Sequence, residues 1–94
     1  MKYFDWDAVK NEKLRAERGI SFEDIVIAIE EGGLLAILEH PSHTKYPNQR
    51  VLIVQFEHYA YIVPYVEDEE KYFLKTIIPS RKMTKQYGVE RKNL

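Results

Sequence analysis

The sequence predicts one α+β domain, in which two N-terminal helices pack on an antiparallel β-sheet meander of about four strands. Two capped helical segments lie within residues 8–31, and apolar residues then alternate with a period of two. Turn-forming residues separate the later segments. The 94 residues suffice for a single domain, 1–94, with one modest core. The twelve aromatic residues are typical of a folded chain.

The N-terminal segment begins with residues 2–6, which form a first strand or an extended arm. Asp7 is an N-cap residue for a helix over residues 8–18, and Gly19 ends this helix. Because apolar residues are sparse in it, we expect the helix to be largely solvated.

The second helix has the clearest signals. Ser21 begins it, and Asp24 follows at the spacing of a capping box. The Gly32-Gly33 pair ends it. Four apolar residues with helical spacing form one stripe, which we expect to cover the sheet: Phe22, Ile25, Val26 and Ile29.

The remainder predicts four strands, over residues 34–39, 50–56, 59–66 and 71–78. Only Glu57 and His58 separate the middle two, which is the spacing of a tight hairpin. Pro64 cannot donate a ladder hydrogen bond, so it indicates an edge or a bulge. Pro79 ends the last strand, and Ser80 caps a short C-terminal helix over residues 81–87.

The composition excludes several kinds of site. With no cysteine, the chain has no disulfide, no thiolate metal ligand and no cysteine nucleophile. The first residues, MKYFDWD, lack the apolar core of a signal peptide, and no apolar run has membrane-spanning length. We therefore expect a soluble cytoplasmic protein without a membrane partner.

The charge is strongly polarised along the chain. Residues 71–94 hold seven Lys/Arg and one Asp/Glu, a formal charge of about +6. Residues 1–70 hold the other seven Lys/Arg and fourteen Asp/Glu, about −7. Such asymmetry indicates a charged partner, which is a nucleic acid at the basic end, an acidic protein there, or both in turn.

The basic end offers a site for phosphodiester chemistry. Arg81 and Lys85 are four residues apart and lie on one side of the expected helix, and Tyr87 lies on another with Met83. Lys75 alternates with Phe73 and Ile77, which would place it on their face of the last strand. Cations bind phosphate through charge-assisted hydrogen bonds. Cleavage further needs a base and an acid, which Tyr87 or a lysine with a depressed pKa could supply. The simpler interpretation is a solvated basic face.

Other polar clusters favour structural interpretations. His40 and His43 form an H-x-x-H pair without an evident third metal ligand, so ordinary loop histidines are the simpler interpretation. His58 is expected at an exposed hairpin tip. The carboxylates of residues 67–70 repel one another and are expected in solvent. Three alternating tyrosines pack on one strand face or stack bases, and packing is the simpler interpretation: Tyr59, Tyr61 and Tyr65.

Three ordered motifs resemble the BrnT-type toxins of bacterial type II toxin–antitoxin modules, whose fold is similar to that of RelE and ParE. They are Phe4-Asp5-Trp6-Asp7 with Lys10 and Asn11, then Arg18 to Glu23, and Ile77 to Lys82 with a later Tyr87. The resemblance spans nearly the whole chain in the same order. Its departures are Glu17-Arg18 where the family has Lys-His, and Pro79-Ser80 where it has Ser-Ala.

The resemblance implies a metal-independent ribonuclease that arrests growth by cutting RNA. It implies no cofactor, because RelE-like toxins use cationic and phenolic side chains. The partners would be an RNA substrate and a cognate antitoxin, with operator DNA reached only through the antitoxin. In this interpretation the catalytic residues are Arg81, Tyr87, Lys85 and Arg18, and Lys75 and Lys82 bind the substrate.

Two alternatives remain open. Because an arginine at position 18 cannot act as a base at neutral pH, the chain is also consistent with a toxin-fold protein that binds without cutting, as an antitoxin partner and co-repressor or as a ribosome-binding module. The other alternative is a small interaction protein unrelated to toxins, whose basic end binds an acidic protein.

Overall fold

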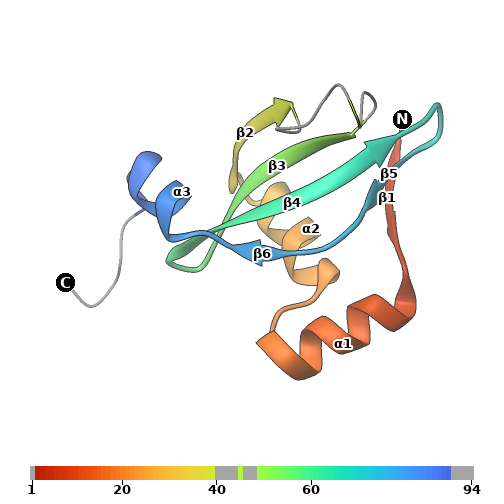
Figure 1. The fold of residues 1–94 in the computed structure, drawn as a ribbon, viewed down its shortest axis with the longest axis horizontal. Coiled ribbons are helices and arrows are strands. Elements are labelled where there is room, and N and C mark those ends of the chain that lie inside the picture. The colour runs from red at the N-terminus through yellow and green to blue at the C-terminus, as the bar shows by residue number, and fades with distance from the viewer. Residues whose placement is uncertain (1, 40–44, 46–48, 90–94) are drawn as a thin grey trace.

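A computed structural model describes residues 2–39, 45 and 49–89 (Figure 1). Six strands and three helices form within this part of the chain, and the fold class is α+β. They are β1 (Tyr3–Trp6), α1 (Ala8–Arg18), α2 (Phe22–Glu30), β2 (Leu34–Glu39), β3 (Gln49–Phe56), β4 (Tyr59–Glu67), β5 (Lys71–Leu74), β6 (Ile78–Pro79) and α3 (Arg81–Gln86). None of the described helices is long and apolar enough to span a membrane.

The sheet is mixed, and the prediction of about four antiparallel strands is wrong in two respects. Its order is β1-β5-β4-β3-β2, with β6 also paired to β4. β1 runs parallel to β5, with Tyr3 opposite Lys71 and Trp6 opposite Leu74. The other pairs are antiparallel, as the meander predicts. The N-terminal arm adds a strand, and the expected fourth strand is divided in two.

This division of the fourth strand lies beside one of the two prolines, Pro64, and the divided strand ends at the other, Pro79. The last strand does not run unbroken over residues 71–78, because residues 75–77 belong to neither β5 nor β6. Pro64 lies inside β4, between the residues that pair with β5 and those that pair with β6. The irregularity is therefore in the neighbouring strand rather than at an outer edge. Pro79 is the last residue of β6, opposite Tyr61, so the strand ends at this proline as predicted.

Both N-terminal helices begin and end as predicted. The Asp7 carboxylate accepts a hydrogen bond from the backbone N–H of Val9, and Gly19 takes the left-handed conformation with φ 68°. The Ser21 and Asp24 side chains form a complete capping box. Only Asn11 and Leu14 of α1 are buried, so this helix is largely solvated.

The main core lies between the helices and one face of the sheet. Phe22 and Ile25 are fully buried, and Val26 and Ile29 are half-buried against the same cluster. The sheet contributes Leu52, Val54, Val63, Tyr65 and Leu74. The predicted apolar stripe of α2 thus covers the sheet.

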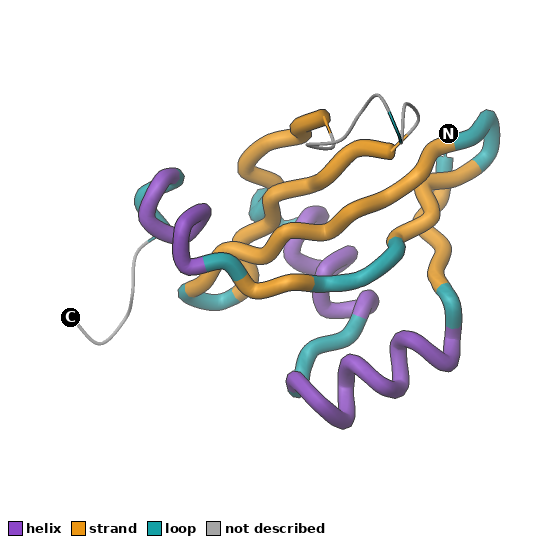
Figure 2. The backbone as a smooth tube through the Cα atoms, in the orientation of Figure 1, coloured by secondary structure: helices purple, strands orange, loops and turns teal. Residues whose placement is uncertain are grey.

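The opposite face of the sheet carries a smaller core that the sequence did not predict. Its buried members are Val51, Ile53 and Ala60, and Met83, Tyr87 and Val89 pack against them. α3 therefore packs on the other face of the sheet from the helices of the main core, and it lies at one end of the molecule (Figure 2).

Candidate functional site

The C-terminal helix begins at the residue that the sequence predicts. The Ser80 hydroxyl accepts a hydrogen bond from the Met83 backbone N–H at 3.1 Å. Thr84, which is 3% exposed, fixes the helix to β4: its hydroxyl accepts from the Ala60 N–H at 2.9 Å and donates to the Ser80 carbonyl at 2.8 Å. A single threonine in a basic segment gives no sequence signal for this role.

The two sides of α3 differ in exposure, as the spacing predicts. Met83 and Tyr87 are half-buried against the smaller core. Arg81, Lys82 and Lys85 are exposed. The Tyr87 ring is thus held by packing at the end of the helix that presents the three cations.

The segment that contains α3 and the chain leading into it, residues 75–89, has no carboxylate side chain. Residues 75–89 contain four Lys/Arg and no Asp or Glu. Within the described part of the chain, none of these four cations forms an ion pair. Their charges are therefore open to an anionic ligand.

Lys75 is not on a strand, which corrects the expectation for this residue. It lies in the link between β5 and β6, where its backbone N–H donates to the Pro64 carbonyl at 2.8 Å. Ile77 is fully buried whereas Lys75 is exposed. The Lys75 ammonium lies 5.7 Å from the centroid of the Phe73 ring. Lys75 and Ile77 therefore do not share a face.

Arg18 joins the end of α1 to the segment that precedes α3. Its guanidinium donates a hydrogen bond to the Ile77 carbonyl, 59 residues further along the chain. This bond uses one of the five N–H donors of the side chain. Residue 18 is therefore brought beside the link that leads into α3.

The cationic segment and the acidic hairpin tip lie at opposite ends of the molecule. Residues 68–70 connect β4 to β5 at one end of the longest axis, and α3 lies at the other (Figure 1). Lys71 belongs to the acidic end, where its ammonium is 3.3 Å from the Asp5 carboxylate. The Lys71 and Lys75 ammonium groups lie 5.8 Å and 5.7 Å from the centroid of the same Phe73 ring, so Lys75 lies near Lys71 rather than on α3.

The acidic tip has a structural explanation. The four carboxylates of residues 67–70 are exposed. Asp68 accepts hydrogen bonds from the backbone N–H groups of Glu70 and Lys71, which lower the pKa of its carboxyl. His58 is exposed at the β3–β4 turn, and His40 and His43 lie outside the described residues. No three His, Asp or Glu side chains gather as a metal site in the described ranges.

The tyrosines of β4 pack rather than form an open row. Tyr65 belongs to the main core, and Tyr61 is half-buried against it. Burial raises the pKa of both phenols, and the nearby Glu57 and Tyr59 raise the pKa of Tyr61 further. Neither phenol is therefore a base at neutral pH. Tyr59 is half-buried, with its ring centroid 5.8 Å from that of Tyr61.

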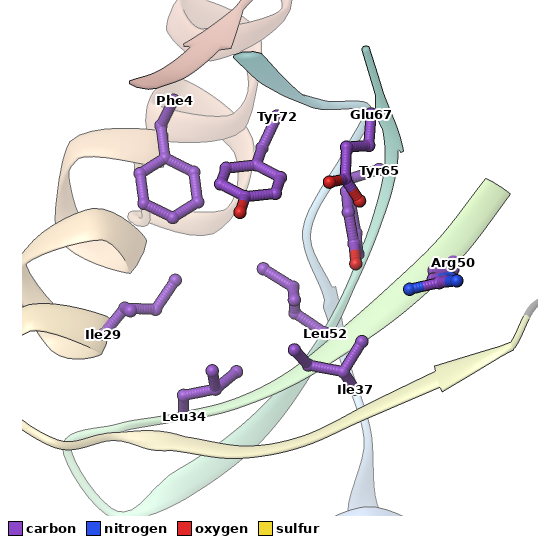
Figure 3. Close-up of a pocket in the computed structure, with 9 residues that line it drawn as sticks. All are labelled: Phe4, Ile29, Leu34, Ile37, Arg50, Leu52, Tyr65, Glu67 and Tyr72. Carbon is purple, nitrogen blue, oxygen red and sulfur yellow. The ribbon is translucent and has the colours of Figure 1, made fainter. Parts of the chain in front are cut away.

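Two pockets lie away from the cationic surface. One, of about 310 Å³, lies on the helix-covered face of the sheet (Figure 3). The other, of about 390 Å³, lies at the C-terminal end of α2. Neither is lined by any of the six residues that the sequence singles out for RNA chemistry. Five of these residues are exposed and Tyr87 is half-buried, so none of the six lies inside either cavity.

Comparison with models of protein families, with curated proteins and with solved structures finds no match for this chain.

Proposed function

We propose that this chain is the toxin of a bacterial type II toxin–antitoxin module, a BrnT-type ribonuclease with a RelE/ParE-like fold. The observation that carries the proposal is the carboxylate-free run of exposed cations on and beside α3, with Tyr87 held at the end of the helix. The ordered motifs of the sequence support it independently.

The proposed reaction is metal-independent cleavage of an RNA phosphodiester. The 2′-hydroxyl attacks phosphorus, the bond to the 5′-oxygen breaks, and a cyclic phosphate and a 5′-hydroxyl are formed. Arg81 and Lys85 stabilise the charge that develops on the phosphorane, and Lys75 and Lys82 hold the backbone. Tyr87 is the candidate for proton transfer. Arg18 supports the site beside the Ile77 carbonyl.

The proposed partner is a small DNA-binding antitoxin in the cytoplasm. It would lay an acidic or apolar segment over the cationic surface, and the complex would reach operator DNA through the antitoxin alone. The separation of α3 from the acidic hairpin tip supports this arrangement, because it leaves the cations accessible to such a segment (Figure 1).

A second candidate is a toxin-fold module that binds RNA or its antitoxin without cutting. The observation that favours it is the open position of the candidate residues, which line neither pocket. Enzymes usually exclude water from the reacting groups, and an exposed helix surface does this poorly unless a partner covers it.

Induced expression in a bacterium decides between the two. The measurements are growth and the integrity of cellular RNA for the wild type, Arg81→Ala and Arg15→Ala. Arg15 is an exposed arginine of α1 that bonds Glu12 and Glu23, so its replacement removes the same charge away from α3. We expect growth arrest and new RNA ends for the wild type and Arg15→Ala, and neither for Arg81→Ala.

Two results would count against cleavage. If the wild type does not arrest growth and the purified protein leaves RNA intact, the chain is a binding module. If Arg81→Ala and Arg15→Ala arrest growth equally, the activity does not depend on the α3 surface.

A further inference from the structure

The pocket on the helix-covered face of the sheet has the features of a ligand site (Figure 3). It lies beside the C-terminal end of α2, and its lining includes residues of five strands, from β1 across the sheet to β2. Its volume of about 310 Å³ is at the lower end of the range for small-molecule pockets. The lining residues are Phe4, Ile29, Leu34, Ile37, Arg50, Leu52, Tyr65, Glu67 and Tyr72.

Most of this lining is apolar. Leu52 is 5% exposed, whereas Leu34 and Ile37 are 38% and 52% exposed at the rim. Figure 3 shows these side chains, together with Phe4 and Ile29, around one open space. An apolar ligand in that space would remove the exposed leucine and isoleucine surface from water, which is favourable.

Arg50 supplies a cation that no carboxylate of the described residues neutralises by an ion pair. Glu67 bonds Lys2 instead. Glu39 is opposite Arg50 in the β2–β3 register, and both side chains are exposed without an ion pair between them. Burial raises the pKa of the Tyr65 phenol, and the Arg50 guanidinium beside it opposes that shift. The partner of Arg50 inside the pocket is thus a neutral phenol.

Tyr72 adds a second polar group. Its hydroxyl points into the open space (Figure 3), and a phenol can both donate and accept a hydrogen bond. The Lys2 ammonium lies 5.5 Å from the centroid of this ring, on the side of the Glu67 ion pair. Polar groups therefore gather toward one end of an apolar cavity.

We infer that this pocket binds a small apolar carboxylic acid, with its aryl or hydrocarbon part against Leu52 and Ile37 and its carboxylate on Arg50. An arginine binds a carboxylate with two parallel hydrogen bonds, which fixes the orientation of the acid. This binding goes beyond the proposed function and is independent of it, because no pocket residue belongs to the cationic surface on α3.

The test uses 2-naphthoate titrated into ¹⁵N-labelled protein, followed by the backbone amide resonances. We expect shifts confined to the lining residues, with a dissociation constant on the order of 1 mM or below. Arg50→Gln should weaken binding about tenfold, because a charge-assisted hydrogen bond is lost. Arg15→Gln, which removes the same charge outside the pocket, should leave it unchanged. The neutral analogue 2-naphthamide should also bind about tenfold more weakly.

Three results would overturn the inference. They are no shifts up to the solubility limit of 2-naphthoate, shifts centred outside the pocket, and equal binding of the acid and the amide by the wild type. Equal binding would mean that the pocket selects an uncharged apolar group and that Arg50 contributes nothing to recognition. If Arg50→Gln disturbs the fold, Ile37→Glu at the exposed rim should weaken 2-naphthoate more than the amide, by like-charge repulsion.

Discussion

Asn11 joins the first two helices through both ends of its amide. Its nitrogen donates to Glu23 at 2.8 Å, and its oxygen accepts from the Phe22 backbone N–H at 2.7 Å. The side chain is 4% exposed, so its loss leaves a buried N–H without a partner. We expect Asn11→Ala to lower the free energy of unfolding by about 1–3 kcal/mol, measured by urea denaturation.

The control for this change is Lys13→Ala, at an exposed position of the same helix. Its effect should stay within about 0.5 kcal/mol. Equal losses for the two variants would mean that helix propensity, not the amide bridge, sets the stability of α1.

Gly33 is required for the close approach of α2 to β3. A Cβ at this position would lie 2.5 Å from the Gln55 carbonyl oxygen and 2.8 Å from that of Ala28. Both neighbours are backbone and cannot move aside cheaply. We expect Gly33→Ala to destabilise the fold by about 1–3 kcal/mol, measured by thermal or urea unfolding.

Gly88→Ala is the comparison, because Gly88 has a φ of 63° but open space around its Cα. It should cost only the left-handed backbone strain, about 1 kcal/mol. A larger loss at position 88 than at position 33 would contradict the packing argument.

At the scale of elements, the stability of α3 depends on the Thr84 hydroxyl, which bonds the helix to β4. The helix has six residues, too few to be stable alone, and Thr84 anchors it to the Ala60 N–H. We expect Thr84→Val to keep the side-chain shape but to expose the Ala60 amide to hydrogen exchange. The protection of the Ala60 amide should fall by about tenfold or more, because one buried hydrogen bond is lost. The protection of the Ile53 amide in the sheet should fall less.

Thr84→Ser keeps the hydroxyl and is the matched control. It should retain the Ala60 protection that the valine variant loses. Loss of protection in both variants would show that the methyl group, rather than the hydrogen bond, holds the helix.

Local signals predict the ends of the elements well, and long-range contacts explain what they miss. Asp7, Ser21 and Ser80 cap their helices as expected, because a cap bonds within three residues of itself. The parallel pairing of Tyr3 with Lys71 spans most of the chain, and no periodicity within either segment encodes it. The division of the fourth strand likewise depends on Pro64 in its neighbour.

The candidate site divides in the same way. Arg81 and Lys85 lie on one side of α3, and Tyr87 is its C-cap residue on the other side, so helical spacing alone places them. The bond from Arg18 to Ile77 and the pocket around Leu52 are assembled from distant segments. An interaction of this kind is visible only after the sheet has formed.

At the scale of the whole molecule, acid should unfold the protein through three carboxylates with a lowered pKa. Backbone N–H groups lower the pKa of Asp5 and Asp68 most, and the Asn11 amide does so for Glu23. A carboxylate whose pKa is lower in the folded state than in the unfolded state stabilises the fold at pH values above its unfolded-state pKa, which is near 4. This stabilisation is lost as the pH falls through the folded-state pKa.

We therefore expect the urea midpoint to be nearly constant from about pH 7 to pH 5 and to fall below about pH 4. Asp68→Asn should make this decline shallower, because the variant has one fewer carboxylate to protonate. A midpoint that rises on acidification, or a decline as steep in Asp68→Asn as in the wild type, would contradict the assignment.

The separation of charge along the molecule makes RNA binding depend on salt. Log affinity falls as log salt rises, and each phosphate contact makes this decline steeper by about 0.7 for a single strand. We expect affinity for a short fluorescent single-stranded RNA to fall with salt. Three substitutions should each make that decline shallower by about 0.7: Lys75→Gln, Arg81→Gln and Lys85→Gln. Lys13→Gln removes an equal charge from the exposed surface of α1 and should leave the slope unchanged. If all four variants change the slope equally, net charge, rather than the cations at positions 75, 81 and 85, attracts the RNA.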